Sequence, residues 1–546
     1  MAERLRLALA QQNCCVGDIE ANTAAIISAV AKARDGLHAD LVAFPELAIT
    51  GYPPEDLLFR PGLHRRVEAA LERIMRETRG IRALVGHPEA APEGLYNSVT
   101  LFHDGARVLT YRKQRLPNYA VFDEKRYFIE GRAPAVVDVN GYRIGLGICE
   151  DIWDPATSVA ARDAGAEFIL NVNASPYHTL QRAARLAALR AAGAASGLPI
   201  VYLNLVGGQD ELVFDGGSLA VAARGDVRAA GPEFEEALLC WEIGRGRNGL
   251  EISGGLSAPL TGDENVYAAL VLGVRDYVRK NRFKGAVLGL SGGIDSALTL
   301  AIAADALGAE NVTAIAMPSR YTADMSNEDA ALQARALGSS FHVVPIEQPF
   351  AAFNDILAPV FAGAAADVTE ENIQARCRGI ILMAVSNKTG RIVLTTGNKS
   401  EMSVGYATLY GDMAGGFAPL KDVPKMLVYR LSRWRNSRGI VIPERVIERP
   451  PSAELRPDQK DTDSLPPYEV LDPILEMYIE RDLTPQEICA QGYELETVKR
   501  VARMVDRNEY KRRQAAPGVR ITQRAFGRDR RFPITSGYHE QDPEPA

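Results

Sequence analysis

The sequence predicts an α/β protein with two domains, and three observations support this fold class. Through about the first 240 residues, short apolar runs typical of strands alternate with Ala-rich stretches typical of helices. A segment rich in Gly and polar residues then breaks the pattern. After it, a second series runs strand, glycine turn, helix and strand, an order that favours a doubly wound parallel sheet. We therefore expect one domain at 1–245, a linker at 246–264 and a second domain at 265–546.

The strands of the first domain are predicted from their apolar runs. These runs lie at 5–11, 39–46, 81–88, 142–149, 167–175 and 199–207. Helical stretches fall between several of them, for example at 21–34 and 180–195. Two layers of sheet covered by helices would bury such runs.

The second domain is predicted to alternate helices and strands in the same way. We expect helices at 266–281 and 326–337 and strands at 285–291, 313–318, 340–346 and 391–397. A further helix is expected at 368–390, with Thr369 as its N-cap, Glu370 and Glu371 in its first turn and Gly390 at its end. The strand at 391–397 leads into a polar loop at 398–412.

One segment, 448–468, is rich in Pro and in charged residues. It contains no clear helical or strand periodicity. We expect either a mobile loop or a disordered insert there.

The composition excludes several classes of protein. Apolar residues make up 47% and charged residues 24%, and the net charge of -7 gives no basic footprint for nucleic acid. No run approaches the roughly 18 apolar residues that a membrane span needs, and the N-terminus becomes polar too soon for a secretion signal. The six cysteines form neither a disulfide framework nor a C-x-x-C zinc pair, so we expect a reducing, cytoplasmic compartment.

The most informative stretch is GLSGGIDSA (289–297), which follows an apolar strand and opens a helix. Its serine and glycines allow a tight turn that exposes backbone N–H groups, and the helix N-terminus adds partial positive charge. An anion should therefore sit at this turn. No G-K-[ST] follows, so the turn is not a Walker A loop, and a Gly-rich turn without a ligand remains the alternative.

The pattern S-G-G-x-D-S after a strand resembles the pyrophosphate loop of the N-type ATP pyrophosphatases. The resemblance implies an adenine nucleotide hydrolase-like fold that cleaves ATP between its α and β phosphates. The implied ATP-binding residues are Gly289, Leu290, Ser291, Gly292, Gly293, Ile294, Asp295 and Ser296. A carboxylate such as Asp295 beside phosphates makes sense if Mg²⁺ lies between them.

Three segments stand out in the first domain. AFPELAITGYPPEDL places Glu46 at the end of a strand, YRKQRLPNYAVFDEKRYF carries Lys113, and GLGICEDIWDP places Cys149 at a strand-to-turn junction. Each has an ordinary interpretation: a helix cap, a solvated lysine and a small core residue. Together they resemble the nitrilase-type amidases, whose catalytic residues are Glu, Lys and Cys in this chain order.

This resemblance implies an α-β-β-α sandwich with a hydrolytic site. Glu46 would take the thiol proton, Cys149 would form the thioester, and Lys113 would stabilise the oxyanion. Residues expected to contact glutamine are Tyr119, Ser175, Gln181 and Glu124, with Glu124 also orienting Lys113. Many related enzymes carry a charged residue at the position of Gln181.

The segments ENIQAR, TTGNKSE and YGD in the second domain resemble the NAD synthetase domain. The resemblance implies that Thr396 lies against ATP, that Glu401 contacts deamido-NAD or, with Asp295, the metal, and that Asp412 closes the YGD motif. The remaining residues implied for deamido-NAD are Asn372, Lys425 and Lys511.

The combination of the two domains resembles the glutamine-dependent NAD synthetases over nearly the whole chain. Cys is not residue 2, and the first domain lacks the motifs of a Cys-His-Glu glutaminase. The resemblance implies that ATP, with Mg²⁺, adenylylates deamido-NAD and that ammonia from glutamine then gives NAD, AMP and pyrophosphate. It also implies a homo-oligomer with small-molecule substrates and no nucleic-acid or membrane partner. An amidotransferase acting on another carboxylate, or a sensor that has lost catalysis, are the alternatives.

Overall fold

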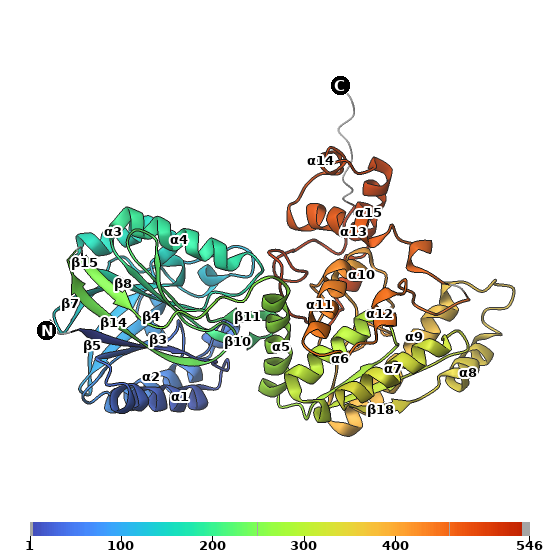
Figure 1. Ribbon diagram of the computed structural model, residues 1–546, viewed down its shortest axis with the longest axis horizontal. Helices are drawn as coiled ribbons and strands as arrows, with labels where there is room; N and C mark the ends of the chain where they lie inside the picture. The colour runs from blue at the N-terminus through green and yellow to red at the C-terminus, as the bar shows by residue number, and fades with distance from the viewer. Residues whose placement is uncertain (1–3, 248, 458, 538–546) are drawn as a thin grey trace. The chain divides into compact units, whose positions relative to one another are not determined.

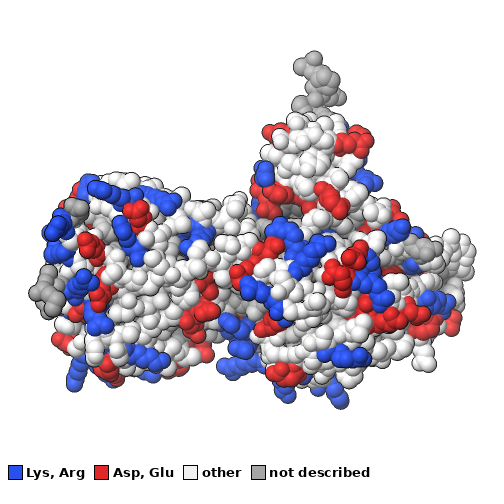
Figure 2. Space-filling view, in the orientation of Figure 1, with Lys and Arg blue, Asp and Glu red and all other residues white. Residues whose placement is uncertain are grey.

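The computed structural model describes residues 4–247, 249–457 and 459–537, and the chain forms two compact units that divide between Thr261 and Gly262 (Figure 1). Each unit is described by itself. No helix in these ranges is both long and apolar enough to cross a membrane. On the face of either unit that Figure 2 shows, acidic and basic side chains are interspersed.

The first unit contains two mixed sheets. One has the order β15-β14-β1-β2-β3-β4-β5 and the other β13-β12-β9-β8-β7-β6. The first sheet comprises β1 (Leu5–Gln11), β2 (Leu41–Ala43), β3 (Arg82–Ala91), β4 (Gly94–His103), β5 (Ala106–Arg112), β14 (Ala237–Gly246) and β15 (Gly249–Ser253). The second comprises β6 (Val136–Val139), β7 (Tyr142–Ile148), β8 (Phe168–Asn173), β9 (Ile200–Asn204), β12 (Leu219–Val221) and β13 (Val227–Ala230). A separate hairpin joins β10 (Val206–Gln209) and β11 (Leu212–Asp215).

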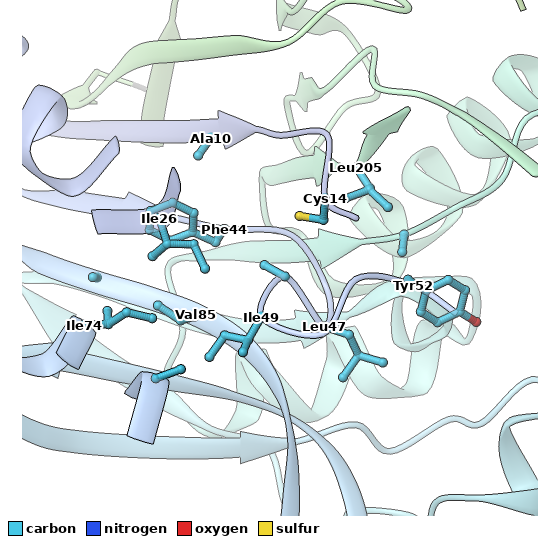
Figure 3. Packing of buried hydrophobic residues seen from close by; sticks show 14 of the residues in the cluster. Ala10, Cys14, Ile26, Phe44, Leu47, Ile49, Tyr52, Ile74, Val85 and Leu205 are labelled. Carbon is cyan, nitrogen blue, oxygen red and sulfur yellow. The ribbon is translucent and has the colours of Figure 1, made fainter. Parts of the chain in front are cut away.

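Apolar residues on alternate faces of the strands hold four layers together. Along β1, Leu5, Leu7 and Leu9 join a core that includes both sheets, whereas Ala8 and Ala10 face α1 (Ile19–Ala31) and α2 (Pro61–Arg76). Figure 3 shows Ala10, Ile26, Phe44 and Val85 of the latter cluster. The outer face of the second sheet packs on α3 (Pro155–Asp163) and α4 (Gln181–Ser196). The predicted α-β-β-α sandwich is therefore confirmed.

The second unit is built on a four-stranded parallel sheet of order β18-β17-β16-β19. Its strands are β16 (Ala286–Gly289), β17 (Val312–Ala316), β18 (Ser340–Val343) and β19 (Ile392–Val393). The chain moves outward from β16 to β18 and then returns to the other side of β16. This reversal is the switch point at which open α/β sheets bind ligands, so the doubly wound fold is confirmed.

Helices surround this sheet and extend beyond it. They are α5 (Gly262–Lys280), α6 (Ile294–Leu307), α7 (Asp324–Leu337), α8 (Glu347–Leu357), α9 (Val368–Thr389), α10 (Lys399–Val404), α11 (Lys425–Ser437) and α12 (Glu444–Glu448). A further helical cluster comprises α13 (Tyr468–Leu475), α14 (Pro485–Cys489), α15 (Leu495–Arg507) and α16 (Glu509–Arg512). α13 and α15 contribute Leu471, Ile474, Val498 and Val501 to a shared core, in which all four are fully buried.

Three local predictions differ from the structure. The N-cap of α9 is Asp367, not Thr369, because Asp367 and Glu370 form a reciprocal capping box. The loop predicted at 398–412 contains α10, whose first turn is closed by a capping box between Asn398 and Glu401. Part of the predicted linker forms β15, because its backbone pairs antiparallel with β14.

The Pro-rich segment 448–468 is anchored where the structure describes it, which differs from a mobile or disordered insert. Arg449 donates a hydrogen bond to the carbonyl of Gly292 at 2.7 Å, and the Leu455 carbonyl accepts one from Gln374 at 2.9 Å. Tyr468 donates to Asp461 at 2.8 Å. Hydrogen bonds to Gly292 and from Gln374, together with one inside the segment, therefore anchor a stretch that has little regular structure of its own.

Candidate functional site

The first candidate site forms where β7 ends. Its last residue is Ile148, and Cys149 opens the short 3₁₀ turn Cys149–Trp153. The φ angle of Cys149 is 44°, in the left-handed region that residues other than glycine rarely occupy. Such strain is often found at functional positions, and here it turns the chain sharply at a buried thiol.

Glu46 lies just after β2, held by backbone packing. A Cβ atom on Gly86 of β3 would stand 2.3 Å from the Pro45 carbonyl oxygen and 2.6 Å from the Leu47 nitrogen, so glycine is needed for this close approach. The Glu46 carboxylate is fully buried and accepts hydrogen bonds from Asn97 Nδ2 at 2.7 Å and from the Ala174 backbone nitrogen at 3.0 Å.

Lys113 follows β5 and joins Glu46 to a second carboxylate. Its Nζ lies 2.7 Å from Glu46 Oε1 and 2.8 Å from Glu124 Oε2, and all three side chains are buried. Burial lowers the pKa of Lys113, but Glu124 and Glu46 outweigh it and raise the pKa well above its ordinary value. Lys113 is therefore a charged ammonium at neutral pH.

The thiol of Cys149 is protonated at rest. Burial raises its pKa well above the ordinary value, Glu46 raises it further, and Lys113 opposes the change. A proton acceptor is therefore required before the sulfur becomes nucleophilic. The site can supply one, because it combines a carboxylate, an ammonium and a thiol in one buried cluster.

Of the residues predicted to contact glutamine, Tyr119 and Gln181 each form a side-chain hydrogen bond near Cys149 or Ser175, and Glu124 belongs to the cluster around Lys113. Tyr119 is 55% exposed, and its hydroxyl donates to Glu150 Oε1 at 3.0 Å, beside Cys149 in the chain. Gln181 Nε2 donates to Ser175 Oγ at 3.1 Å. Glu124 lies with Lys113, where Tyr52 also donates to it at 2.8 Å.

Several residues around this site were missed from the sequence. They are Tyr52, Asn97, Glu150, Asp151, Arg185 and Asp215. The adjacency of Glu150 and Asp151 to Cys149 was an available signal, whereas Asn97 is brought near Glu46 only by strand β4. Arg185 and Asp215 form a fully buried bidentate ion pair behind Ser175, with the shorter contact at 3.0 Å.

The second candidate site begins at the glycine turn between β16 and α6. The φ angle of Gly292 is 78°, and a Cβ atom there would lie 2.3 Å from the Ser326 carbonyl oxygen. Ser291 Oγ accepts from the Gly293 nitrogen at 3.2 Å and lies 3.1 Å from Ser296 Oγ. These contacts hold the turn at the N-terminus of a fourteen-residue helix.

A cavity of about 280 Å³ lies over this turn at the switch point of the sheet. Among the sequence-predicted residues, its lining includes Gly289, Leu290, Ser291, Gly293, Ile294, Asp295, Ser296, Thr396, Glu401, Asp412 and Lys425. Gly292, Asn372 and Lys511 are outside the lining that the structure gives. Sequence reasoning missed Lys421 and Arg449 and gave Arg378 no ligand role, although all three line the cavity.

Lys425 lies between two carboxylates inside this cavity. Its ammonium forms an ion pair with Asp295 and lies 3.6 Å from Glu401 Oε1. Asn398 donates to the other oxygen of Asp295 at 2.9 Å. Burial and the charge of Asp295 raise the pKa of Glu401 to about 8, against the opposing effect of Lys425. The ammonium of Lys425 therefore offsets part of the negative charge that Asp295 and Glu401 bring into the cavity.

Asn372, Asp412 and Lys511 meet around the loop after α10. Asn372 accepts from Thr408 Oγ1 at 2.8 Å, and Asp412 accepts from the Thr408 nitrogen at 2.7 Å. Lys511 donates to the carbonyls of Gly405 and Ala407 at 2.8 and 2.9 Å. Asp412 also lines the cavity, so it connects this layer to the pocket.

Asp295 and Glu401 have the donor type that Mg²⁺ prefers. Mg²⁺ is commonly held by one or two carboxylates together with substrate phosphates and water. Within the described ranges, no group of three or more His, Cys, Asp or Glu is arranged to hold a metal ion. Two carboxylate side chains beside an anion-binding turn fit a cation that arrives with phosphate oxygens.

The two halves of the chain match two protein families. Residues 6–249 match the carbon-nitrogen hydrolase family, and residues 266–515 match the NAD synthase family.

Relatives with the same two-part organisation match nearly the whole chain. A glutamine-dependent NAD(+) synthetase from Xanthomonas campestris is 51% identical, with 99% of either chain covered, and one from Acinetobacter baylyi is 48% identical, with coverage of 98% and 99%. A solved glutamine-dependent NAD+ synthetase from Acinetobacter baumannii, in complex with adenosine diphosphate, is 46% identical, with a TM-score of 0.80 over 99% of this chain and 100% of that one. Its counterpart from Cytophaga hutchinsonii is 25% identical, with a TM-score of 0.84 over 98% of each chain.

We expect the variant Asp412→Asn to change how stability depends on pH. Asp412 is exposed at one side, but desolvation by the surrounding chain raises its pKa from the ordinary value of 3.8 to about 6, against the opposing Thr408 hydrogen bond and Lys511. The stability contributed by the protonated carboxyl is therefore fully present below about pH 4 and is lost as pH rises through about 6. Asn cannot titrate, so the variant should gain stability relative to the wild type between pH 4 and 7. Because Asp412 is exposed and solvent screens its charge, the gain should be less than about 1 kcal/mol.

Thermal unfolding of both proteins across this pH range checks the expectation. A difference in Tm that stays constant with pH would contradict it.

Proposed function

Because this chain belongs to the glutamine-dependent NAD(+) synthetases, we propose that Glu46, Lys113 and Cys149 release ammonia from glutamine and that the cavity beside Asp295 uses it. The enzyme converts deamido-NAD to NAD with ATP and glutamine, giving AMP, pyrophosphate and glutamate. The observation that carries the proposed site is the buried contact of Lys113 with Glu46 beside the Cys149 thiol.

The first chemical step follows from the protonation states. Glu46 takes the proton from the Cys149 thiol, and the thiolate attacks the side-chain amide carbon of glutamine. Lys113 stabilises the negative oxygen of the tetrahedral intermediate, because its pKa is held high by the two carboxylates. The proton on Glu46 passes to the departing ammonia, leaving a γ-glutamyl thioester.

Hydrolysis of the thioester completes the cycle. Glu46 now takes a proton from water, the resulting hydroxide attacks the thioester, and glutamate leaves. Glu124 keeps Lys113 in place through bonds to both of its oxygens, at 2.9 and 2.8 Å. We assign glutamine recognition to Tyr119, Ser175 and Gln181, whose hydroxyl and amide groups can bind the ends of an amino acid.

We assign ATP to the glycine turn. Its residues place backbone N–H groups and the N-terminus of α6 at one end of the cavity, where phosphate is favoured. Thr396 lines the same cavity from the carboxyl end of β19. The complex of the Acinetobacter baumannii relative with adenosine diphosphate supports an adenine nucleotide as ligand.

Asp295 and Glu401 would hold Mg²⁺ with the phosphates of ATP. The ion would offset phosphate charge when the nicotinate carboxylate attacks the α phosphate. Lys425 lies between the same carboxylates and would contact phosphate or the nicotinate side. We assign Asn372 and Lys511 to deamido-NAD binding. Both contact the loop after α10, which Asp412 connects to the cavity.

Ammonia then attacks the adenylylated carboxylate, and AMP leaves. In neutral solution most ammonia is ammonium, which is not nucleophilic, so a protected route for ammonia is part of the proposal. The comparisons give no support to another carboxylate as substrate. Assays with ATP, Mg²⁺ and deamido-NAD, or with alternative acids in place of deamido-NAD, test this, and glutamine can be compared with ammonium as donor.

The variant Cys149→Ala should separate the two activities. Without the sulfur no thioester forms, so glutamine-driven NAD synthesis should fall by a factor on the order of 10⁴. Synthesis from ammonium should be retained, because the second cavity is intact. The measurement is NAD formation with either nitrogen source, and Cys240→Ala, which changes a cysteine of β14, is the matched control. Equal loss of both activities would contradict the assignment.

The variant Asp295→Ala should remove NAD synthesis from either nitrogen source. Loss of a carboxylate beside the phosphates should reduce the rate on the order of 100-fold or more. Asp355→Ala, at an exposed position of α8, is the control. Retained ammonium-driven synthesis in Asp295→Ala at saturating Mg²⁺ would refute the role of Asp295.

We also propose that two copies of the chain pair through the second unit. The helices α8 and α9 are in contact, and large apolar side chains on and between them are exposed, including Ile356 at 69%, Val360 at 75% and Ile380 at 58%. An exposed apolar surface of this kind is typical of a protein interface.

Analytical ultracentrifugation should give a mass above the 59.3 kDa of one chain. Ile356→Asp should shift it towards the monomer, whereas Val108→Asp, at an exposed position of the first unit, should not. A monomeric wild type at assay concentration would exclude this proposal.

A further inference from the structure

Asp151 is a buried carboxylate that contacts the chain on both sides of the glutaminase site. It is 2% exposed and lies two residues after Cys149. Its Oδ1 accepts hydrogen bonds from the backbone nitrogens of Gln114 at 3.0 Å and Arg115 at 2.8 Å. Its Oδ2 accepts from the Ile148 nitrogen at 3.0 Å and from the Tyr111 hydroxyl at 2.7 Å.

These four donors come from two segments. Tyr111, Gln114 and Arg115 flank Lys113, which follows β5 in the first sheet. Ile148 ends β7 in the second sheet and immediately precedes Cys149. One carboxylate therefore ties the backbone around the ammonium to the backbone that presents the sulfur.

The other catalytic groups are held in a different way. Glu46 is fixed by Asn97 and Ala174, and the ammonium of Lys113 by Glu46 and Glu124. No hydrogen bond to the Cys149 sulfur is present among the described residues. The position of the sulfur is therefore set by the backbone of its turn, including the left-handed φ of Cys149.

From this arrangement we infer that Asp151 is a positioning residue that fixes Cys149 relative to Lys113 during glutamine hydrolysis. The inference rests on the proposed roles of Lys113 and Cys149. It assigns Asp151 no contact with substrate.

A carboxylate suits this position because it only accepts hydrogen bonds. Asn has almost the same shape, but its amide nitrogen would face two of the four donors. A buried N–H group that loses its acceptor is costly, so the turn or the Lys113 segment would shift to find another partner. Displacement by about 1 Å is enough to reduce a rate about 100-fold.

The test uses the full-length enzyme with the substitution Asp151→Asn. We expect kcat for glutamine hydrolysis to fall about 100-fold, with KM for glutamine changed less than about threefold. Ammonium-driven NAD synthesis should be unchanged. Ser158→Ala is the matched control, because Ser158 is buried in the adjacent α3 and its hydroxyl has no partner among the described residues.

The rate at which iodoacetamide alkylates Cys149 separates positioning from a general structural role. If the turn moves away from Lys113, the thiolate loses a neighbouring cation and alkylation at fixed pH should slow. If the substitution merely loosens the fold, the buried thiol should become more accessible and alkylation should accelerate. Mass spectrometry of the Cys149 peptide measures this rate.

An unchanged kcat in Asp151→Asn would overturn the inference, and so would a lower kcat with faster alkylation. If Asp151→Asn does not fold, Tyr111→Phe replaces it, because this variant removes one donor to Asp151. We expect Tyr111→Phe to lower kcat about threefold, and an unchanged kcat would also overturn the inference. Cys149→Ala is measured alongside. Glutamine hydrolysis by Cys149→Ala would refute the proposed site itself. If Cys149→Ala loses glutamine hydrolysis but Asp151→Asn hydrolyses glutamine at the normal rate, only the positioning role is refuted.

Discussion

The first unit depends on the buried ion cluster of Lys113 with Glu46 and Glu124. Removing three charges from water is expensive, and the cluster persists because Asn97, Ala174 and Tyr52 supply the remaining hydrogen bonds. The cluster places two carboxylates and one ammonium beside the thiol, and burial raises the pKa of Glu124 to about 7 against the opposing effect of Lys113. Burial and the neighbouring Glu46 raise the pKa of the Cys149 thiol, so the sulfur stays protonated until a base acts on it. In the proposed mechanism, the thiol loses its proton when a substrate binds whose developing oxyanion Lys113 would stabilise.

The second unit handles charge differently. Its cavity gathers Asp295 and Glu401 around Lys425, and burial raises the pKa of Glu401. The N-terminus of α6 favours anions, while the carboxylates of Glu401 and of Asp295, which lies in the first turn of the same helix, favour cations. Phosphate groups accompanied by Mg²⁺, as proposed, would satisfy both preferences at once. The same chain therefore contains one site arranged for proton transfer at a thiol and another arranged for ATP chemistry.

Sequence patterns located the central residues because their signals are local. A strand ending in Cys149 or in the glycine turn can be read from a few adjacent residues, and periodicity gives the layers of the fold. Asn97 was missed because it depends on β4 pairing with β3, and the pairing of Lys425 with Asp295 depends on the packing of α11 against α6. The cap at Asp367 had a local signal, the D-x-x-E spacing to Glu370, but Thr369 offered a competing side chain. The roles in glutamine and deamido-NAD binding rest on resemblance, because no ligand contact is visible in a single sequence.

The packing at Gly86 has a consequence for protein engineering. Glu46, the proposed general base, lies on a loop whose main chain packs directly against the main chain of the neighbouring strand β3. Libraries that seek a new amide substrate by randomising this strand would lose catalysis at that one position for steric reasons alone. Variation of substrate range is better sought among the side chains at the rim, such as Tyr119 and Gln181, where a change need not move the base.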